Sequence, residues 1–219
     1  MIHKLININA LTPEAISEYY PMLSARRKQS IANLTTPTQR ARQFCAEMLT
    51  RQCLSELTGQ AQDSFAFLYG PGGAGLVEGS DLHIVCAFGG EYVLTAAAHC
   101  PLGADLTLLE PFNFSQTQKY LTDGELRTVF AASRIGMAQA VMEPLCTDKT
   151  AVYRLNALLS AKRACFGAMG KQLDMPYKSI EILWKDGMRC SDERLKIALS
   201  DISEDKQYIL TVVERIGDS

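Results

Sequence analysis

The sequence predicts an α+β fold in which two similar halves, residues 1–110 and 111–219, form a pseudo-twofold duplication. Each half has a long amphipathic helix followed by strand-like apolar segments. In addition, EYVLTAA at 91–97 resembles QYILTVV at 207–213. A chain of 219 residues suits one large domain or two small fused ones. An α+β unit used twice accounts for these features, and chance similarity of apolar segments is the alternative.

In the first half, residues 38–57 predict a helix, because apolar side chains recur every three or four positions. These side chains are Phe44, Met48, Leu49, Cys53 and Leu57. Gly59 marks the end of the helix. After a Gly/Pro-rich turn at YGPGGAG, residues 82–109 predict three short strands broken at Gly89-Gly90 and Cys100-Pro101.

In the second half, the segment from Asp123 to Met142 predicts a helical region, and residues 151–170 predict a long helix that ends in Gly170. Three strand-like segments follow the long helix. They are SIEILW at 179–184, LKIALSDI at 195–202 and QYILTVVER at 207–215.

Charge and composition argue against several classes of function. The chain has 22 basic and 24 acidic residues and a pI near 6.0, so neither nucleic acid nor an anionic membrane would be attracted to the whole protein. An apolar run long enough to span a bilayer is missing, and the start does not resemble a signal peptide, so we expect a cytoplasmic protein. Seven scattered cysteines predict reduced thiols rather than a metal site.

Six segments, taken together in their order and spacing, resemble the 4'-phosphopantetheinyl transferases of the surfactin-synthetase-activating type. They cover nearly the whole chain and include a basic cluster with an Arg-containing helix, a YGKP-like turn, and counterparts of the GVDIE and KEA motifs. The segments are residues 23–57, YGPGG, GGEYVLTAA, PLGADLTLLE, YLTDGEL and LLSAKRACFGAMGKQL.

The resemblance implies a monomer built from two such halves. It also implies transfer of phosphopantetheine from coenzyme A to a serine of an acyl or peptidyl carrier protein. In such a reaction a divalent cation would offset the charge on the leaving nucleotide, and a positioned base would take the serine proton.

The implied Mg2+ site departs from the family pattern. Asp105 matches the aspartate of GVDIE, whereas Thr107 replaces its glutamate and Arg163 replaces the glutamate of KEA. Mg2+ prefers an octahedron of hard oxygens, so this set supports it poorly. Two alternatives remain for Arg163: an ion pair with Asp105 that fills the vacated site, or a guanidinium that replaces the metal and binds a diphosphate.

The resemblance assigns Arg27, Arg42 and Gly90 to coenzyme A binding. Other positions that are basic in relatives carry uncharged residues here. They are Ser30, Pro71 and Gly167. The family's serine and phosphate-contacting histidine are replaced by Ala87 and Phe88, which cannot donate hydrogen bonds from their side chains.

Two residues of the family's reaction centre are retained. Glu125 and Lys162, with Arg163, are therefore the candidate catalytic residues. The alternatives are that Glu125 only favours a helix start and that Lys162 is a solvated helix residue. Glu110, at the end of its strand, could supply a replacement carboxylate, although a surface position is the other interpretation.

Two functions from different classes follow. The first is a divergent phosphopantetheinyl transferase, and the second is a catalytically silent homologue that binds a carrier protein, a nucleotide or another subunit. GPGGAG lacks the Gly-Lys-Ser/Thr of a phosphate-binding loop, so it predicts a turn. SARRK lacks the interleaved aromatic residues that would favour nucleic-acid binding.

Overall fold

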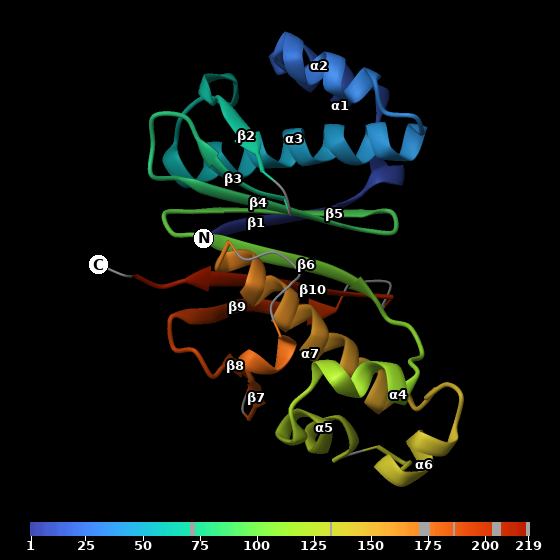
Figure 1. The fold of residues 1–219 in the computed structure, drawn as a ribbon. Helices are drawn as coiled ribbons and strands as arrows, with labels where there is room; N and C mark the ends of the chain where they lie inside the picture. The colour runs from blue at the N-terminus through green and yellow to red at the C-terminus, as the bar shows by residue number, and fades with distance from the viewer. Residues whose placement is uncertain (71–72, 132, 171–175, 186, 203–206, 218–219) are drawn as a thin grey trace.

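Two antiparallel β-sheets lie face to face in the computed structural model, and helices cover the outer face of each sheet (Figure 1). The four layers, helix, sheet, sheet and helix, confirm the predicted α+β class. The structure describes residues 1–70, 73–131, 133–170, 176–185, 187–202 and 207–217.

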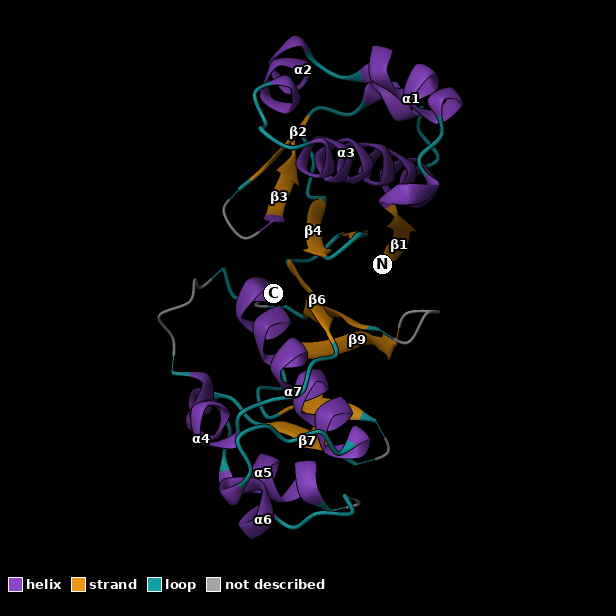
Figure 2. Ribbon diagram, turned by 90° about the vertical axis from the view of Figure 1, so that its right-hand side faces the viewer, coloured by secondary structure: helices purple, strands orange, loops and turns teal. Residues whose placement is uncertain are grey.

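The first half is a five-stranded sheet covered by one long helix. Its elements are β1 (Ile2–Asn7), α1 (Pro13–Tyr19), α2 (Ala25–Ala32), α3 (Pro37–Thr58), β2 (Phe67–Tyr69), β3 (Ala74–Val77), β4 (His83–Gly89) and β5 (Tyr92–Ala98), with short 3-10 helices at Ile8–Ala10, Tyr20–Met22 and Gln62–Ser64. The strand order is β1-β5-β4-β3-β2. Helix α3 packs on β1 and β5, while α1 and α2 lie on its far side (Figure 2).

The ends of α3 follow from its sequence. Thr36 and Gln39 form a capping box, which satisfies backbone N–H groups that the first turn leaves unpaired. Pro37 begins the helix, where its missing N–H costs nothing. Gly59 ends it with a left-handed backbone at φ +75°. The predicted helix at 38–57 is therefore confirmed.

The second half has a three-stranded sheet, a neighbouring hairpin and a second long helix. Its elements are β6 (Leu102–Leu108), α4 (Phe114–Thr117), α5 (Asp123–Phe130), α6 (Met137–Met142), α7 (Lys149–Ala168), β7 (Ile182–Trp184), β8 (Met188–Cys190), β9 (Leu195–Ile202) and β10 (Tyr208–Arg215), with 3-10 helices at Gln118–Tyr120 and Tyr177–Ser179. The strand order is β6-β10-β9, and the β7–β8 hairpin contacts β9 through β8. Helix α7 packs on β6 and β10.

One strand pairing occurs in both halves, although their sheets differ in strand number. The first strand of each half pairs antiparallel with the last strand, β1 with β5 and β6 with β10. Each long helix covers that pair of strands. Strand β6 therefore belongs to the second sheet, and the division between the sheets falls at residues 99–101, ahead of the expected boundary at residue 110.

An apolar core joins the sheets. Fully or nearly buried side chains of β4 and β5 meet those of β6 and β10, so the inner face of each sheet is covered by the other. These side chains are Val85, Leu94, Ala96, Ala98, Leu102, Leu106, Tyr208, Leu210 and Val212. Separate clusters lie beneath α3 and beneath α7.

Candidate functional site

Asp105, Thr107 and Arg163 meet between β6 and α7. Alternate residues of a strand share one face, and the face of β6 that carries Asp105 and Thr107 is turned toward α7. Gly103 lies on the same face, where a Cβ would collide with the backbone of Ala164, so glycine permits the close approach of helix and strand. This approach brings Arg163 within reach of Asp105.

The Arg163 guanidinium forms a two-point ion pair with the Asp105 carboxylate. Nε donates to Oδ1 at 2.8 Å, and one terminal nitrogen donates to Oδ2 at 3.2 Å. The Thr107 hydroxyl donates to Oδ2 and accepts a hydrogen bond from the same guanidinium nitrogen. Both carboxylate oxygens are thus occupied by this chain's own donors, and the expected juxtaposition of Asp105 and Arg163 is present.

The donor set around Asp105 does not fit Mg2+. One carboxylate and one hydroxyl supply few of the oxygens that the ion prefers, and a guanidinium lies where a cation would have to enter. Within the described ranges, groups of three or more His, Cys, Asp or Glu that could hold a metal are absent. Glu110 is exposed at the end of β6, in accordance with the surface interpretation.

Glu125 and Lys162 also meet, but inside the core of the second half. Their side chains are 0% exposed, and Lys162 Nζ lies 2.7 Å from Glu125 Oε2. Lys162 also donates to the carbonyls of Tyr120, Tyr177 and Ile180, at 3.2, 2.7 and 3.0 Å. With every donor engaged, this ammonium has none to offer a phosphate, and the interpretation as a solvated lysine is wrong.

The Glu125 carboxylate also accepts hydrogen bonds from two backbone N–H groups. Glu125 occupies the third position of α5 in a capping box with Thr122, whose N–H donates to Oε2 at 2.8 Å. Its other oxygen accepts a hydrogen bond from the N–H of Ile182, also at 2.8 Å. The expectation that Glu125 favours a helix start is therefore confirmed, and its carboxylate holds α5, α7 and β7 together.

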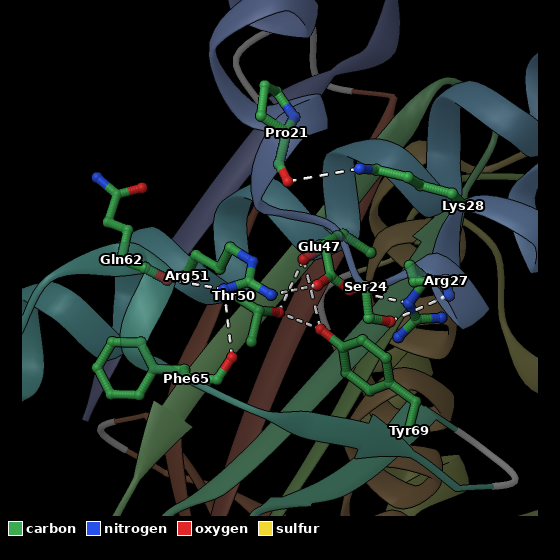
Figure 3. Close-up of polar contacts among 11 residues, drawn as sticks. Pro21, Ser24, Arg27, Lys28, Glu47, Thr50, Arg51, Gln62, Phe65 and Tyr69 are labelled. Carbon is green, nitrogen blue, oxygen red and sulfur yellow. Dashed lines mark hydrogen bonds and ion pairs between the residues drawn. The ribbon is translucent and has the colours of Figure 1, made fainter.

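Arg27, a residue of α2, belongs to a second charged network, which lies between α2 and α3 (Figure 3). Its Nε is 2.9 Å from Glu47 Oε2, and Arg51 donates to Glu47 Oε1 at 3.0 Å. Glu47 and Arg51 are 3% and 5% exposed. Two arginines thus share one buried carboxylate of α3. The Arg27 guanidinium also lies 5.5 Å from the centre of the Tyr69 ring.

A cleft of about 550 Å³ opens beside this network. Its described walls carry three arginines and three acidic residues, so it has no strong excess of positive charge. These are Arg26, Arg27, Arg51, Glu47, Asp63 and Glu78. Ser30 lines the same cleft and adds no charge. Burial raises the pKa of Tyr69 well above its usual value, so its hydroxyl stays protonated at neutral pH.

Arg42 and Gly90 contact one another directly. The Arg42 guanidinium donates to the Gly90 carbonyl, which fastens the first turns of α3 to the β4–β5 turn. Arg42 Nε is buried and has no hydrogen-bond partner in the described part of the chain. The two predicted coenzyme-binding residues are thus brought together, and among the described contacts none joins them to Arg27. Pro71 lies outside the described residues.

Sequence reasoning missed Glu47 and Arg51. Their signal was an acidic and a basic residue four positions apart within the predicted helix, beside its apolar face. That spacing is typical of a solvated surface pair, and the packing of α2 and of residues 62–67 against α3 makes it a buried one.

A scan against protein-family models and a search of curated proteins find no match for this chain. None of the helices in the described ranges combines the length and apolar character needed to cross a membrane. All seven cysteines carry free thiols.

Proposed function

We propose that the chain is a pseudo-twofold duplicated protein of the 4'-phosphopantetheinyl transferase fold. The correspondence of the two halves supports this proposal, because each closes its first strand against its last and covers that pair with one long helix. The resemblance of the six sequence segments supports it independently.

We further propose that the protein is a catalytically silent member of this fold that binds a carrier protein. One observation carries the proposed loss of catalysis: Arg163 occupies both oxygens of Asp105, the single acidic residue retained from the family's metal site. The proposed binding of a carrier protein rests on the sequence resemblance. A guanidinium about 5 Å from a divalent ion would repel it by several kcal/mol, even at an effective dielectric constant near 20. Without that ion, charge on a leaving nucleotide would lack its main stabilisation.

A panel of apo acyl and peptidyl carrier proteins tests this function. With coenzyme A and Mg2+ present, mass spectrometry should show no added phosphopantetheine on any carrier, while calorimetry should show binding of at least one. A mass increase on any carrier, or the absence of binding to all of them, would overturn the proposal.

A variant that restores the acidic residues sharpens the same experiment. Thr107→Glu with Arg163→Glu places three carboxylates around one site, which is the oxygen set that Mg2+ prefers. We expect this double variant to bind Mg2+ or Mn2+ at least tenfold more tightly than the unchanged protein. Equal affinities would show that the Arg163 ion pair does not determine metal binding.

A second candidate is transfer in which Arg163 replaces the metal. About a third of the Arg163 side chain is exposed, and its second terminal nitrogen makes no hydrogen bond within the described residues. That nitrogen could bind a diphosphate. Coenzyme A should then bind equally well with a chelator present, and Arg163→Ala should weaken binding by about 1.5 to 3 kcal/mol.

The Arg194–Asp192 pair provides a matched control, since it is a similar two-point ion pair on the surface. Arg194→Ala should leave coenzyme A binding unchanged. If calorimetry detects no coenzyme A binding to the unchanged protein, the second candidate is excluded.

A further inference from the structure

A second hollow lies at the junction of the two halves, on the side of the molecule where β3 and the end of α7 approach one another (Figure 2). Its volume is about 770 Å³, within the range of pockets that bind small molecules. One wall comes from β3 and the start of β4, and the other from Leu102 and the last turn of α7. It has no residue in common with the Asp105–Arg163 pair.

Several small residues line the hollow. Gly75 in β3 is required to be small, since a Cβ there would collide with the Leu68 carbonyl. On the opposite wall, Gly167 and Ala168 keep the end of α7 free of long side chains. Small residues therefore occur on the walls that both halves contribute.

The walls of this cleft are aliphatic. Leucine, valine, isoleucine and proline side chains surround the small residues, and among the described lining residues the polar side chains are those of Glu78, Ser80 and His83. Lysine and arginine are absent from the part of the lining that the structure describes. Burial lowers the pKa of His83, which keeps the imidazole neutral at pH 7.

The acidic residue Glu78 and the absence of cations from the described walls determine which class of ligand this cleft can bind. Phosphate or carboxylate groups would find no cation on the described walls and would face the negative charge of Glu78. A neutral aliphatic chain would remove its own surface and that of Leu76, which is 58% exposed, from water. We propose that this cleft binds a neutral alkyl chain, such as an acyl chain held in an amide or ester linkage.

The test measures binding of N-hexanoyl-, N-octanoyl- and N-decanoyl-ethanolamine by calorimetry. Burial of each added methylene should tighten binding about fourfold until the chain fills the cleft. Decanoate, with its charged head, should bind at least tenfold more weakly than the decanoyl amide, and inorganic diphosphate should not compete. An affinity independent of chain length, or competition by diphosphate, would overturn the proposal.

Leu76→Glu tests whether the alkyl chain binds in this cleft, because Leu76 is one of its lining residues. The side chain is exposed over more than half its surface, so the variant should fold, and the new charge should weaken decanoyl-amide binding at least tenfold. Ile16→Glu is the matched control, because Ile16 is 41% exposed on α1 and lies outside this cleft. Equal weakening by both variants, or by neither, would place the ligand elsewhere. Either result is independent of carrier binding and of phosphopantetheine transfer.

Discussion

Lys162 and Arg163 are consecutive residues of α7 with opposite environments. Successive helical residues point about 100° apart, so one long basic side chain enters the core while the next reaches the surface of β6. Lys162 is completely buried and has one carboxylate and three carbonyls as partners. Arg163 remains about one-third exposed and neutralises Asp105.

Loss of the buried ammonium should destabilise the protein strongly. Lys162→Met leaves Glu125 as an uncompensated buried charge and three carbonyls without their donor, so the free energy of unfolding should fall by about 3 to 5 kcal/mol. Urea titration measures this change. Lys149→Met, at the exposed first residue of the same helix, should change it by less than about 0.5 kcal/mol. Similar small effects of both variants would show that the pair contributes no stability.

At the scale of elements, α7 positions both ion pairs, and its first turn is fixed by one side chain. Asp148 is the N-cap and accepts a hydrogen bond from the N–H of Ala151 at 3.0 Å. This bond, made to the ionised form, lowers the pKa of Asp148 below its usual value. The carboxylate therefore stabilises the folded state most at pH values high enough to ionise it in both the folded and the unfolded chain.

Asp148→Ala should lower the free energy of unfolding by about 1 kcal/mol at pH 7. Because the folded pKa is depressed, this difference should be complete above the unfolded pKa near 4 and should shrink as the pH falls through the folded pKa. Asp148→Asn keeps a side-chain acceptor, so it should lower the free energy of unfolding by less than Asp148→Ala does. Because asparagine does not titrate, the stability that the ionised carboxylate adds above its pKa should be absent from this variant. Urea unfolding at pH 7, 5 and 3.5 measures both; a difference that grows in acid would contradict this account.

At the scale of the whole molecule, the inner faces of the two sheets form one core, so the halves should unfold together. The chain's single tryptophan, Trp184, lies in β7 of the second half and reports on that half alone. Leu94, in β5 of the first half, is fully buried in the core between the sheets. A defect at Leu94 should therefore be detected at Trp184.

Leu94→Ala should lower the free energy of unfolding by about 2 to 5 kcal/mol, because it leaves a cavity between the sheets. Trp184 fluorescence and far-ultraviolet circular dichroism should give coincident urea transitions, both shifted equally. The half-exposed Leu108 offers the control, since Leu108→Ala should shift neither transition by much. An unmoved Trp184 transition in Leu94→Ala would mean that the halves unfold separately.

The sequence predicted the regular parts of the fold and little of its assembly. Helical periodicity identified α3 and α7, and strand patterns identified β4, β5 and β6. Four elements were not predicted: β1, α1, α2 and β8. A helix of seven or eight residues makes only about two turns and gives a weak periodic signal, and a strand of three residues gives hardly any. The assignment of β6 to the second sheet depends on its pairing with residues 208–214, about 100 positions later, which local patterns do not encode.

The candidate site was predictable only where a motif marked it. Asp105 and Arg163 were expected to meet, because Asp105 matches the aspartate of the family's metal site and Arg163 replaces a glutamate of that same site. The burial of Lys162 was not foreseen, because lysine is almost never fully buried unless it is paired. Its partner Glu125 is 37 positions away in the chain, and only the packing of α5 against α7 brings the two together.

The pairing of first with last strands constrains the order of folding during translation. The first sheet can close once residues 92–97 have left the ribosome to pair with β1, but its inner face is covered completely only when β10 joins β6 on it, more than a hundred residues later. For that interval the nascent chain presents an apolar surface to solvent or to a chaperone. Slow translation of the second half would lengthen this exposure and favour aggregation.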